Sequence, residues 1–240
     1  MKRGKTGFCL WYEKTIGKII PKYGFFSVIF CFVFNSLIYT GLQILMKEAR
    51  HFDLTLPLDR AIPFQPGWSF VYLGCFLFWA VNYILITRQG KEGWYQFAVG
   101  DYLSRIVCGI FFILLPTTNI RPEVSGDGLP EILMQFIYWI DAPTNLFPSI
   151  HCLVSWLCFV GVRGKSYIPK WYQVFSCVFA IAVFASTLFT KQHFVVDVIA
   201  GVIFAELCYY VGHHTKYYQW VLKIFDRINE KVFGDEWDEE

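Results

Sequence analysis

The chain has 240 residues, of which 55% are hydrophobic and only 17% are charged, and its mean hydropathy is +0.42. These values exceed those of soluble domains and exclude an ordinary soluble enzyme. The net charge is only +2, so no strong positive field is present to attract nucleic acid, and we expect no nucleic-acid partner.

The eight cysteines do not indicate a disulfide framework or a metal site. Most of them lie inside long apolar runs, and none of these has the spacing of metal ligands. We therefore expect small buried hydrophobic side chains at Cys31, Cys75, Cys108, Cys158, Cys177 and Cys208.

Three uncharged apolar stretches have the length of a membrane-spanning helix. A hydrocarbon core about 30 Å thick requires about 20 apolar residues in helical form. Residues 25–45, 68–87 and 171–190 meet this requirement and contain no formal charge.

Three further apolar stretches are short or contain charged residues, which suggests function or helix pairing inside the membrane. They are residues 94–116, which contain Asp101 and Arg105; residues 148–163, a stretch shorter than a usual span; and residues 192–213, which contain Asp197 and Glu206. The sequence therefore predicts an all-α integral membrane protein, a six-helix bundle.

The distribution of basic residues predicts the orientation of this bundle. Lys and Arg are concentrated before the first span, in the second and fourth connections and in the tail. The positive-inside rule then places both termini in the cytoplasm. We predict an interfacial amphipathic segment at residues 1–24, without a cleavable signal, a single catalytic domain at 25–213 and a cytoplasmic tail at 214–240.

The longest connection, residues 117–147, faces outward in this topology and is where we expect function. Within it, residues 132–140 are apolar but too few to span, so we expect a helix that lies on or dips into the membrane interface. Covering the bundle and gating access of lipids are equally compatible roles for this helix.

Polar residues cluster at the outward ends of the third, fourth and sixth spans, and only the fold can bring them together. The clusters are Arg121-Pro122, then Pro148-Ser149-Ile150-His151 at the start of the fourth span, and then Ser186 with His193 and Asp197 around the turn into the sixth span. Proline suits a first helical turn, whose free N–H groups can bind an anion.

His193 and Asp197 are four residues apart, which on a helix places both side chains on one face. A carboxylate that accepts one imidazole N–H leaves the other ring nitrogen as a nucleophile toward phosphorus. His151, from another helix, can then protonate the leaving oxygen. Arg121 and Lys191 supply positive charge for a phosphoryl group, and this scheme requires no metal.

These residues resemble the signature of the type 2 phosphatidic acid phosphatase and haloperoxidase superfamily, which reads K-x6-R-P, then P-S-G-H, then S-R-x5-H-x3-D. The resemblance covers about residues 25–213 and implies a six-span enzyme. It implies that His193 is the nucleophile, His151 the general acid and Asp197 the residue that orients His193. Arg121, Ser149 and Ser186 then belong to the phosphate-binding set, with Lys191 as a hypothetical replacement for a motif cation.

The chain departs from this signature at three positions. Leu114 stands at the position of the family lysine, Ile150 at that of a glycine and Thr187 at that of the second arginine. A degenerate first motif with both histidines and the aspartate intact is similar to the branch that contains inositol phosphorylceramide and sphingomyelin synthases.

Three functions follow as hypotheses. The first is a lipid phosphatase, without metal or cofactor, that hydrolyses a phosphate monoester or pyrophosphate at the outer membrane face through a phosphohistidine. The second is a phosphoalcohol transferase to a lipid alcohol, and the third is a non-catalytic scaffold or transporter. Phosphatidate, phosphatidylglycerol phosphate, a polyprenyl pyrophosphate and a sphingolipid phosphate are all compatible substrates.

Other polar residues inside spans are interpreted as structural. Asp101 and Arg105, four residues apart, are expected to pair with each other. Glu206, Asn35 and Asn82 are interpreted as hydrogen-bonding groups in helix packing.

Overall fold

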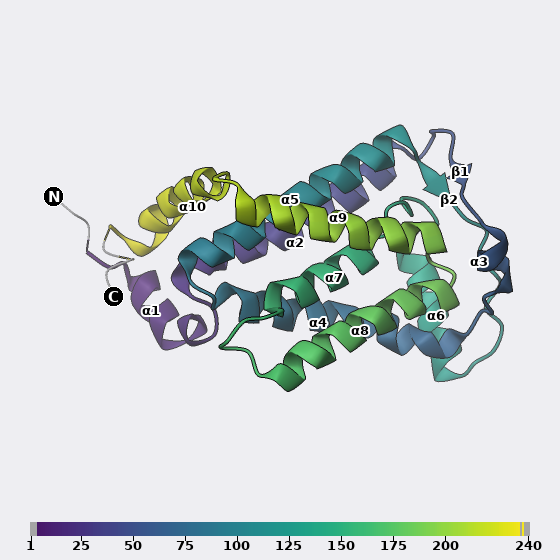
Figure 1. Cartoon of the computed structure of the whole chain (residues 1–240), viewed down its shortest axis with the longest axis horizontal. Helices are drawn as coiled ribbons and strands as arrows, with labels where there is room; N and C mark the ends of the chain where they lie inside the picture. The colour runs from purple at the N-terminus through teal and green to yellow at the C-terminus, as the bar shows by residue number, and fades with distance from the viewer. Residues whose placement is uncertain (1–3, 236, 238–240) are drawn as a thin grey trace.

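A computed structural model of the protein describes residues 4–235 and residue 237, and these residues form a helical bundle (Figure 1). The helices are α1 (Gly7–Lys14), α2 (Lys22–Leu45), α3 (Pro57–Ala61), α4 (Ser69–Thr87), α5 (Lys91–Leu114), α6 (Leu129–Ile140), α7 (Ile150–Val162), α8 (Lys170–Phe189), α9 (Val195–His214) and α10 (Tyr218–Phe233). Short 3-10 turns lie at Ile16–Lys18 and Pro66–Trp68. The strands β1 (Phe52–Asp53) and β2 (Thr117–Thr118) pair in parallel, with Phe52 opposite Thr117.

Five helices of the described chain are long and apolar enough to cross a membrane: α2, α4 with its preceding turn, α5, α8 and α9. The protein is therefore an all-helical membrane protein. The predicted span at residues 148–163 corresponds to α7, whose 13 residues reach only about 20 Å. Helix α7 lies among α4, α5, α8 and α9, and its side chains are almost all buried (Figure 1).

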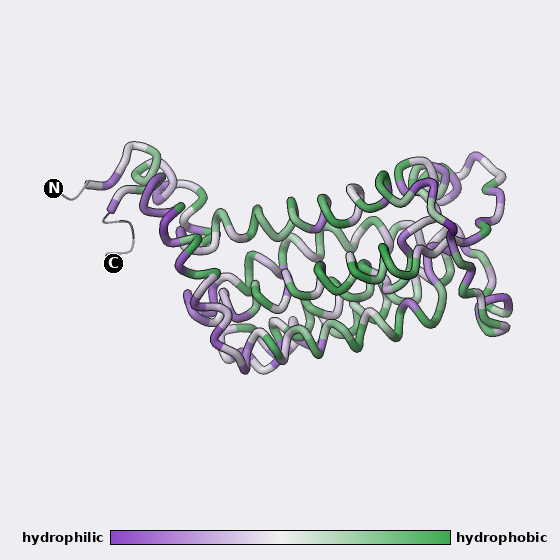
Figure 2. The backbone as a smooth tube through the Cα atoms, turned by 90° about the horizontal axis from the view of Figure 1, so that it is seen from above, coloured by the Kyte–Doolittle hydropathy of each residue, from purple (hydrophilic) through white to green (hydrophobic). Residues whose placement is uncertain are grey.

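Hydrophobic residues cover the middle of the bundle, and polar residues gather at its two ends (Figure 2). Both termini lie at one end, beside α1 and α10, whereas α3, α6 and the two strands lie at the other end (Figure 1). This distribution is what two aqueous boundaries of a membrane require. The cytoplasmic location of the termini stays a prediction.

The predicted N-terminal segment and the predicted tail contact each other at the end of the bundle where α1 and α10 lie (Figure 1). Cys9 and Tyr12 of α1 pack against Phe233 and Trp237, and the Thr6 N–H donates to the Phe233 carbonyl at 3.0 Å. Within the predicted ranges 1–24 and 214–240, residues 1–3, 236 and 238–240 lie outside the described residues.

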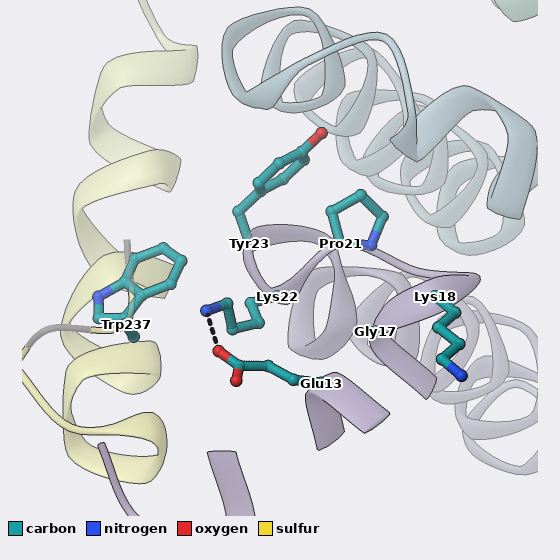
Figure 3. A pocket seen from close by; sticks show the side chains of 7 residues that line it. All are labelled: Glu13, Gly17, Lys18, Pro21, Lys22, Tyr23 and Trp237. Carbon is teal, nitrogen blue, oxygen red and sulfur yellow. Dashed lines mark hydrogen bonds and ion pairs between the residues drawn. The ribbon is translucent and has the colours of Figure 1, made fainter. Parts of the chain in front are cut away.

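A cavity of about 440 Å³ opens beside this contact, and Figure 3 shows its lining. Glu13 accepts hydrogen bonds from Lys22 at 2.8 Å and from Lys5 at 2.9 Å, and these bonds lower the pKa of its carboxyl to about 2. The indole of Trp237 stands on the opposite side of the cavity from Lys18 (Figure 3). The first turns of the chain are thus fixed to the start of α2 by an ion-paired carboxylate.

Glycines allow the central helices to approach closely. A Cβ on Gly212 of α9 would lie 2.3 Å from the Gln96 carbonyl oxygen of α5, and one on Gly100 of α5 would lie 2.9 Å from the Cys208 carbonyl oxygen. Small residues at helix crossings are typical of membrane bundles, because close backbone contact increases van der Waals packing. The pairing of α5 with α9 is accordingly the most extensive in the bundle.

Gly201 gives a testable case, because it lies where α9 crosses the start of α7. A Cβ there would lie 2.8 Å from the Ser149 carbonyl oxygen and 3.2 Å from the Leu153 nitrogen, both backbone atoms. Gly201→Ala is expected to displace α7 from α9 and to lower kcat/KM by about 100-fold, since a shift of about 1 Å suffices for such a loss. The control is Gly41→Ala on α2, where no atom lies within 4 Å. Equal kcat/KM values for Gly201→Ala and Gly41→Ala would contradict the importance of close contact between α7 and α9.

Candidate active site

Two of the three predicted polar clusters meet where α7 and α9 begin. The Ser149 N–H donates to the Asp197 carbonyl oxygen at 3.1 Å, which joins the N-terminus of α7 to the first turn of α9. The Ser149 hydroxyl accepts the Cys152 N–H at 3.2 Å and so caps α7. His151 therefore leaves the first turn of α7 close to the turn that carries His193.

His193 lies in the turn between α8 and α9. The N–H groups of Gln192 and His193 both donate to the Thr187 carbonyl, at 2.9 and 3.2 Å, and Lys191 takes a φ of 55°. The His193 Nδ1 lies 3.4 Å from Asp197 Oδ2, and the Asp197 carboxylate is fully buried. The same oxygen accepts the Phe194 N–H at 2.8 Å. Asp197 thus caps α9 and faces one ring nitrogen of His193.

The two histidine rings are close, with their centroids 5.7 Å apart. His151 is held by aromatic side chains of α4: the ring centroid of Tyr72 lies 4.5 Å away and that of Trp79 lies 5.6 Å away. His151 and His193 are 8% and 7% exposed, so both imidazoles are largely shielded but reachable. Such a pair can act as a nucleophile and an acid on one phosphorus atom.

Arg121 joins the long connection to the α8–α9 turn. Its guanidinium donates to the carbonyl oxygens of Asp141 and Ala142 and, at 2.6 Å, to Gln192 Oε1. The guanidinium carbon also lies 4.8 Å from the ring centroid of Tyr138, a cation–π distance. These contacts fix the orientation of the Arg121 charge beside the histidine turn.

Lys191 is fixed by the segment around α3. Its ammonium donates to the Asp59 and Ile62 carbonyls, the first at 2.8 Å, and the Asn119 side chain donates to the Lys191 carbonyl at 2.7 Å. The Asp59 carboxylate in turn accepts the Val195 N–H at 2.8 Å, at the start of α9. Burial lowers the pKa of the Lys191 ammonium, and the charge of Asp59 partly opposes this shift.

A cavity of about 330 Å³ brings Arg121, Lys191 and His193 to one lining. Two fixed cations beside a histidine favour an anion such as a phosphoryl group. Among the described residues, no three His, Cys, Asp or Glu side chains are grouped so that they can hold a metal ion.

Two predicted phosphate ligands are placed differently. Ser149 and Ser186 are fully buried, and neither lines this cavity. The Ser186 hydroxyl donates to the Val183 carbonyl one turn earlier at 2.7 Å. Their hydroxyls therefore serve the local geometry of α7 and α8 in this structure.

The predicted helix at residues 132–140 is α6, Leu129–Ile140, and it lies against the site. Met134 and Ile137 pack on Tyr72, and the Tyr138 hydroxyl donates to the Thr190 carbonyl at 2.8 Å. Its outer face is apolar, with Trp139 81% exposed. Helix α6 therefore covers the site end of the bundle and presents an apolar face outward.

Sequence reasoning did not identify Asp59, Asn119, Asp141 or Gln192 as site residues. Asp59, Asn119 and Asp141 reach the site from connections far from His193 in sequence, so no local spacing marks them. Gln192 precedes His193 directly, and its Nε2 is buried without a hydrogen-bond partner beside Arg121. Its position next to the candidate nucleophile His193 was the one signal in the sequence that could have identified Gln192 as a site residue.

Comparison with known proteins gives one match. The sequence model of a family described as the PAP2 superfamily matches residues 68–211, which is more than half of the chain. Comparisons with curated proteins and with solved structures gave no match. The matched region begins at the last residue of the turn before α4, so it contains Arg121, Lys191 and His193 and leaves α2 and Arg60 of the cavity outside.

Proposed function

Because the chain belongs to the PAP2 superfamily, we propose that it is a membrane phosphatase that acts on lipid phosphate esters through a phosphohistidine at His193. The observation that carries the proposal is the closeness of the two histidine rings, 5.7 Å apart, together with the position of His193 in a cavity that Arg121 and Lys191 also line. Asp197, placed 3.4 Å from His193 Nδ1, supplies the orienting carboxylate. The predicted orientation places this site at the outer membrane face.

The proposed reaction has two steps. His193 Nε2 attacks phosphorus, the bond from phosphorus to the alcohol oxygen breaks, and His151 gives its proton to that oxygen. Water then attacks the phosphohistidine, His151 takes a proton from the water, and the nitrogen–phosphorus bond breaks to release inorganic phosphate. Asp197, 3.4 Å from Nδ1, stabilises the positive charge of His193 in each step.

The cations act on the phosphoryl group and not on the histidines. Negative charge in the transition state spreads over three equatorial oxygens, which need donors fixed in advance. The Arg121 guanidinium is oriented by three acceptors, and the Lys191 ammonium by two carbonyls. Neither group has to reorganise when the phosphoryl group binds.

A transferase is the second candidate, and one observation favours it. His151 lines a separate cavity of about 220 Å³, which offers space for an alcohol beside the general base. An alcohol there can replace water in the second step and accept the phosphoryl group. The chemistry of His193 is then unchanged, and only the acceptor differs.

The test is release of phosphate from a panel of lipid phosphates and pyrophosphates in detergent, with EDTA present, and with and without added diacylglycerol or ceramide. The phosphatase predicts release of phosphate that is independent of the added alcohol. The transferase predicts a new phosphorylated lipid that forms at the expense of free phosphate. No reaction with any lipid would contradict both functions.

Lys191 allows a prediction of pH dependence. Its ammonium is charged at pH values below its pKa. Because this pKa is lowered, the ammonium loses its positive charge at a lower pH than an ordinary lysine does. The KM for a lipid phosphate is therefore expected to rise on the alkaline side. Lys191→Met should raise KM about tenfold at neutral pH, the effect of losing a charged hydrogen bond. Lys191→Arg should have the KM of wild type at neutral pH and should not show the rise of KM at alkaline pH. An unchanged KM in Lys191→Met would contradict a role of Lys191 in binding the phosphoryl group.

A further inference from the structure

His151 and His193 line different cavities. His193 lines the cavity that Arg121 and Lys191 also line, whereas His151 lines a second cavity of about 220 Å³. The wall of this second cavity, here called the α2 chamber, is formed by α2, α4, α6 and the start of α7. The pair of imidazole rings therefore lies between a cationic cavity and the α2 chamber.

Helix α2 presents a polar face to this chamber. Asn35, Ser36, Tyr39 and Thr40 all line it, and their spacing places them on one side of the helix. Leu37, on another face, is 62% exposed. Polar side chains are costly inside a membrane helix unless they face partners or a cavity.

These groups are not all used by the packing of the bundle. The Asn35 side-chain oxygen is buried and has no hydrogen-bond partner, which differs from the packing hydrogen bond expected from the sequence. The Ser36 hydroxyl donates only to the Phe32 carbonyl of its own helix, at 3.0 Å. A buried oxygen without a donor costs free energy, so a ligand that supplies a donor gains affinity.

The same chamber is connected to the general acid. The Asp141 carboxylate accepts the Tyr39 hydroxyl at 2.6 Å and the Tyr72 hydroxyl at 3.3 Å. The ring of Tyr72 lies against His151 with centroids 4.5 Å apart. The polar face of α2, the end of α6 and the imidazole of His151 are thus in one network.

The chamber continues along α2 and α4. An adjoining cavity of about 150 Å³ shares Asn35, Ser36, Phe76 and Trp79 with it and adds Phe32 and Val154. Arg105 also lines this extension, and its charge is neutralised by Asp101, 2.7 Å away. A ligand in the chamber therefore has space to extend along Phe76 and Trp79.

We propose that the α2 chamber binds the alcohol part of the substrate, an alcohol that carries amide or hydroxyl groups able to donate hydrogen bonds beside its phosphate ester. The assignment rests on the proposed function, because His151 must contact the oxygen that leaves phosphorus while the phosphoryl group lies on the His193 side. The polar face then discriminates ceramide-type alcohols from polyprenols, which have no such groups. Helix α2, which carries this polar face, lies outside the matched family region.

The test compares kcat/KM for a ceramide phosphate and for a polyprenyl phosphate in the same detergent. Wild type should prefer the ceramide phosphate. Asn35→Leu and the isosteric Thr40→Val should each lower the ratio of the two kcat/KM values roughly three- to tenfold, the effect of one hydrogen bond. Leu37→Val, on the exposed face of α2, should leave the ratio and both rates unchanged.

The outcomes separate the two proposals. A wild-type preference for the polyprenyl phosphate, or an unchanged ratio in both variants, would overturn the proposal that the α2 chamber binds the alcohol part of the substrate. Phosphate release that depends on His193 would still support the phosphatase in that case. Absence of His193-dependent phosphate release from both lipids would overturn the proposed function and the chamber with it. Elution of Thr40→Val at the wild-type position in size-exclusion chromatography verifies that its fold is intact.

Discussion

Replacement of His193 by alanine is expected to lower kcat for phosphate release by about 10⁴-fold or more. The imidazole supplies the nucleophilic nitrogen, and the Asp197 carboxylate lies 3.4 Å from its Nδ1. Loss of a covalent nucleophile removes the two-step route altogether, and only binding and charge stabilisation by the site persist. The measurement is single-turnover release of phosphate from the best lipid of the panel.

A matched control is His214→Ala, since His214 lies at the opposite end of α9 and its Nδ1 contacts only the Tyr210 carbonyl, at 2.9 Å. This variant should retain wild-type kcat. Asp197→Asn should fall between the two, because the ring persists but its tautomer and orientation are no longer enforced. Wild-type turnover by His193→Ala would contradict the proposed mechanism.

The second large effect is on stability. Arg105→Met is expected to lower the free energy of unfolding by about 3–5 kcal/mol, because it leaves the Asp101 carboxylate buried without its cation. Arg105 is 2% exposed, its Nη2 lies 2.7 Å from Asp101 Oδ1, and Tyr83 donates to the same oxygen. Unfolding in detergent with a denaturant measures the loss.

The double replacement Asp101→Leu with Arg105→Met removes both charges and should recover most of this loss. The control is Arg163→Met, whose partner Glu206 is partly exposed, with the two side chains 47% and 38% exposed. That variant should cost less than about 1 kcal/mol. Equal losses from Arg105→Met and Arg163→Met would show that burial does not determine the contribution of the Asp101 pair.

The long apolar helices were predictable because charge-free runs of about 20 residues have few alternatives in a membrane. Residues 25–45, 68–87 and 171–190 correspond to Lys22–Leu45, Ser69–Thr87 and Lys170–Phe189. The starts of α2 and α8 differ because these helices begin at Lys22 and Lys170, which a charge-free stretch leaves out. Hydropathy alone does not register such positions.

The central position of α7 was not predictable from its composition. Its short apolar run resembles an incomplete span, whereas in the structure neighbouring helices bury it on every side. That position depends on close backbone contacts, such as Gly201 against Ser149, between segments about 50 residues apart in sequence. Spacing within one helix carries no information about such a contact.

The site was predictable to the extent that its geometry is local. The spacing of His193 and Asp197 on one helix predicts their contact; the structure places them together, although His193 lies in the turn before α9 and not on the helix. The acceptors that orient Arg121 and Lys191 include backbone carbonyls of distant segments, such as Asp141 and Asp59, which have no side-chain signature. Only the folded chain defines them.

The most direct test of the central claim is covalent trapping of the intermediate. The protein is mixed with a lipid substrate labelled in its phosphorus, quenched in alkali and digested, and the labelled peptide is identified. The proposed mechanism predicts an acid-labile, alkali-stable phosphoryl group on His193 in wild type and none in His193→Ala. A stable label on another residue, or turnover by wild type without any phosphohistidine under these conditions, would contradict it.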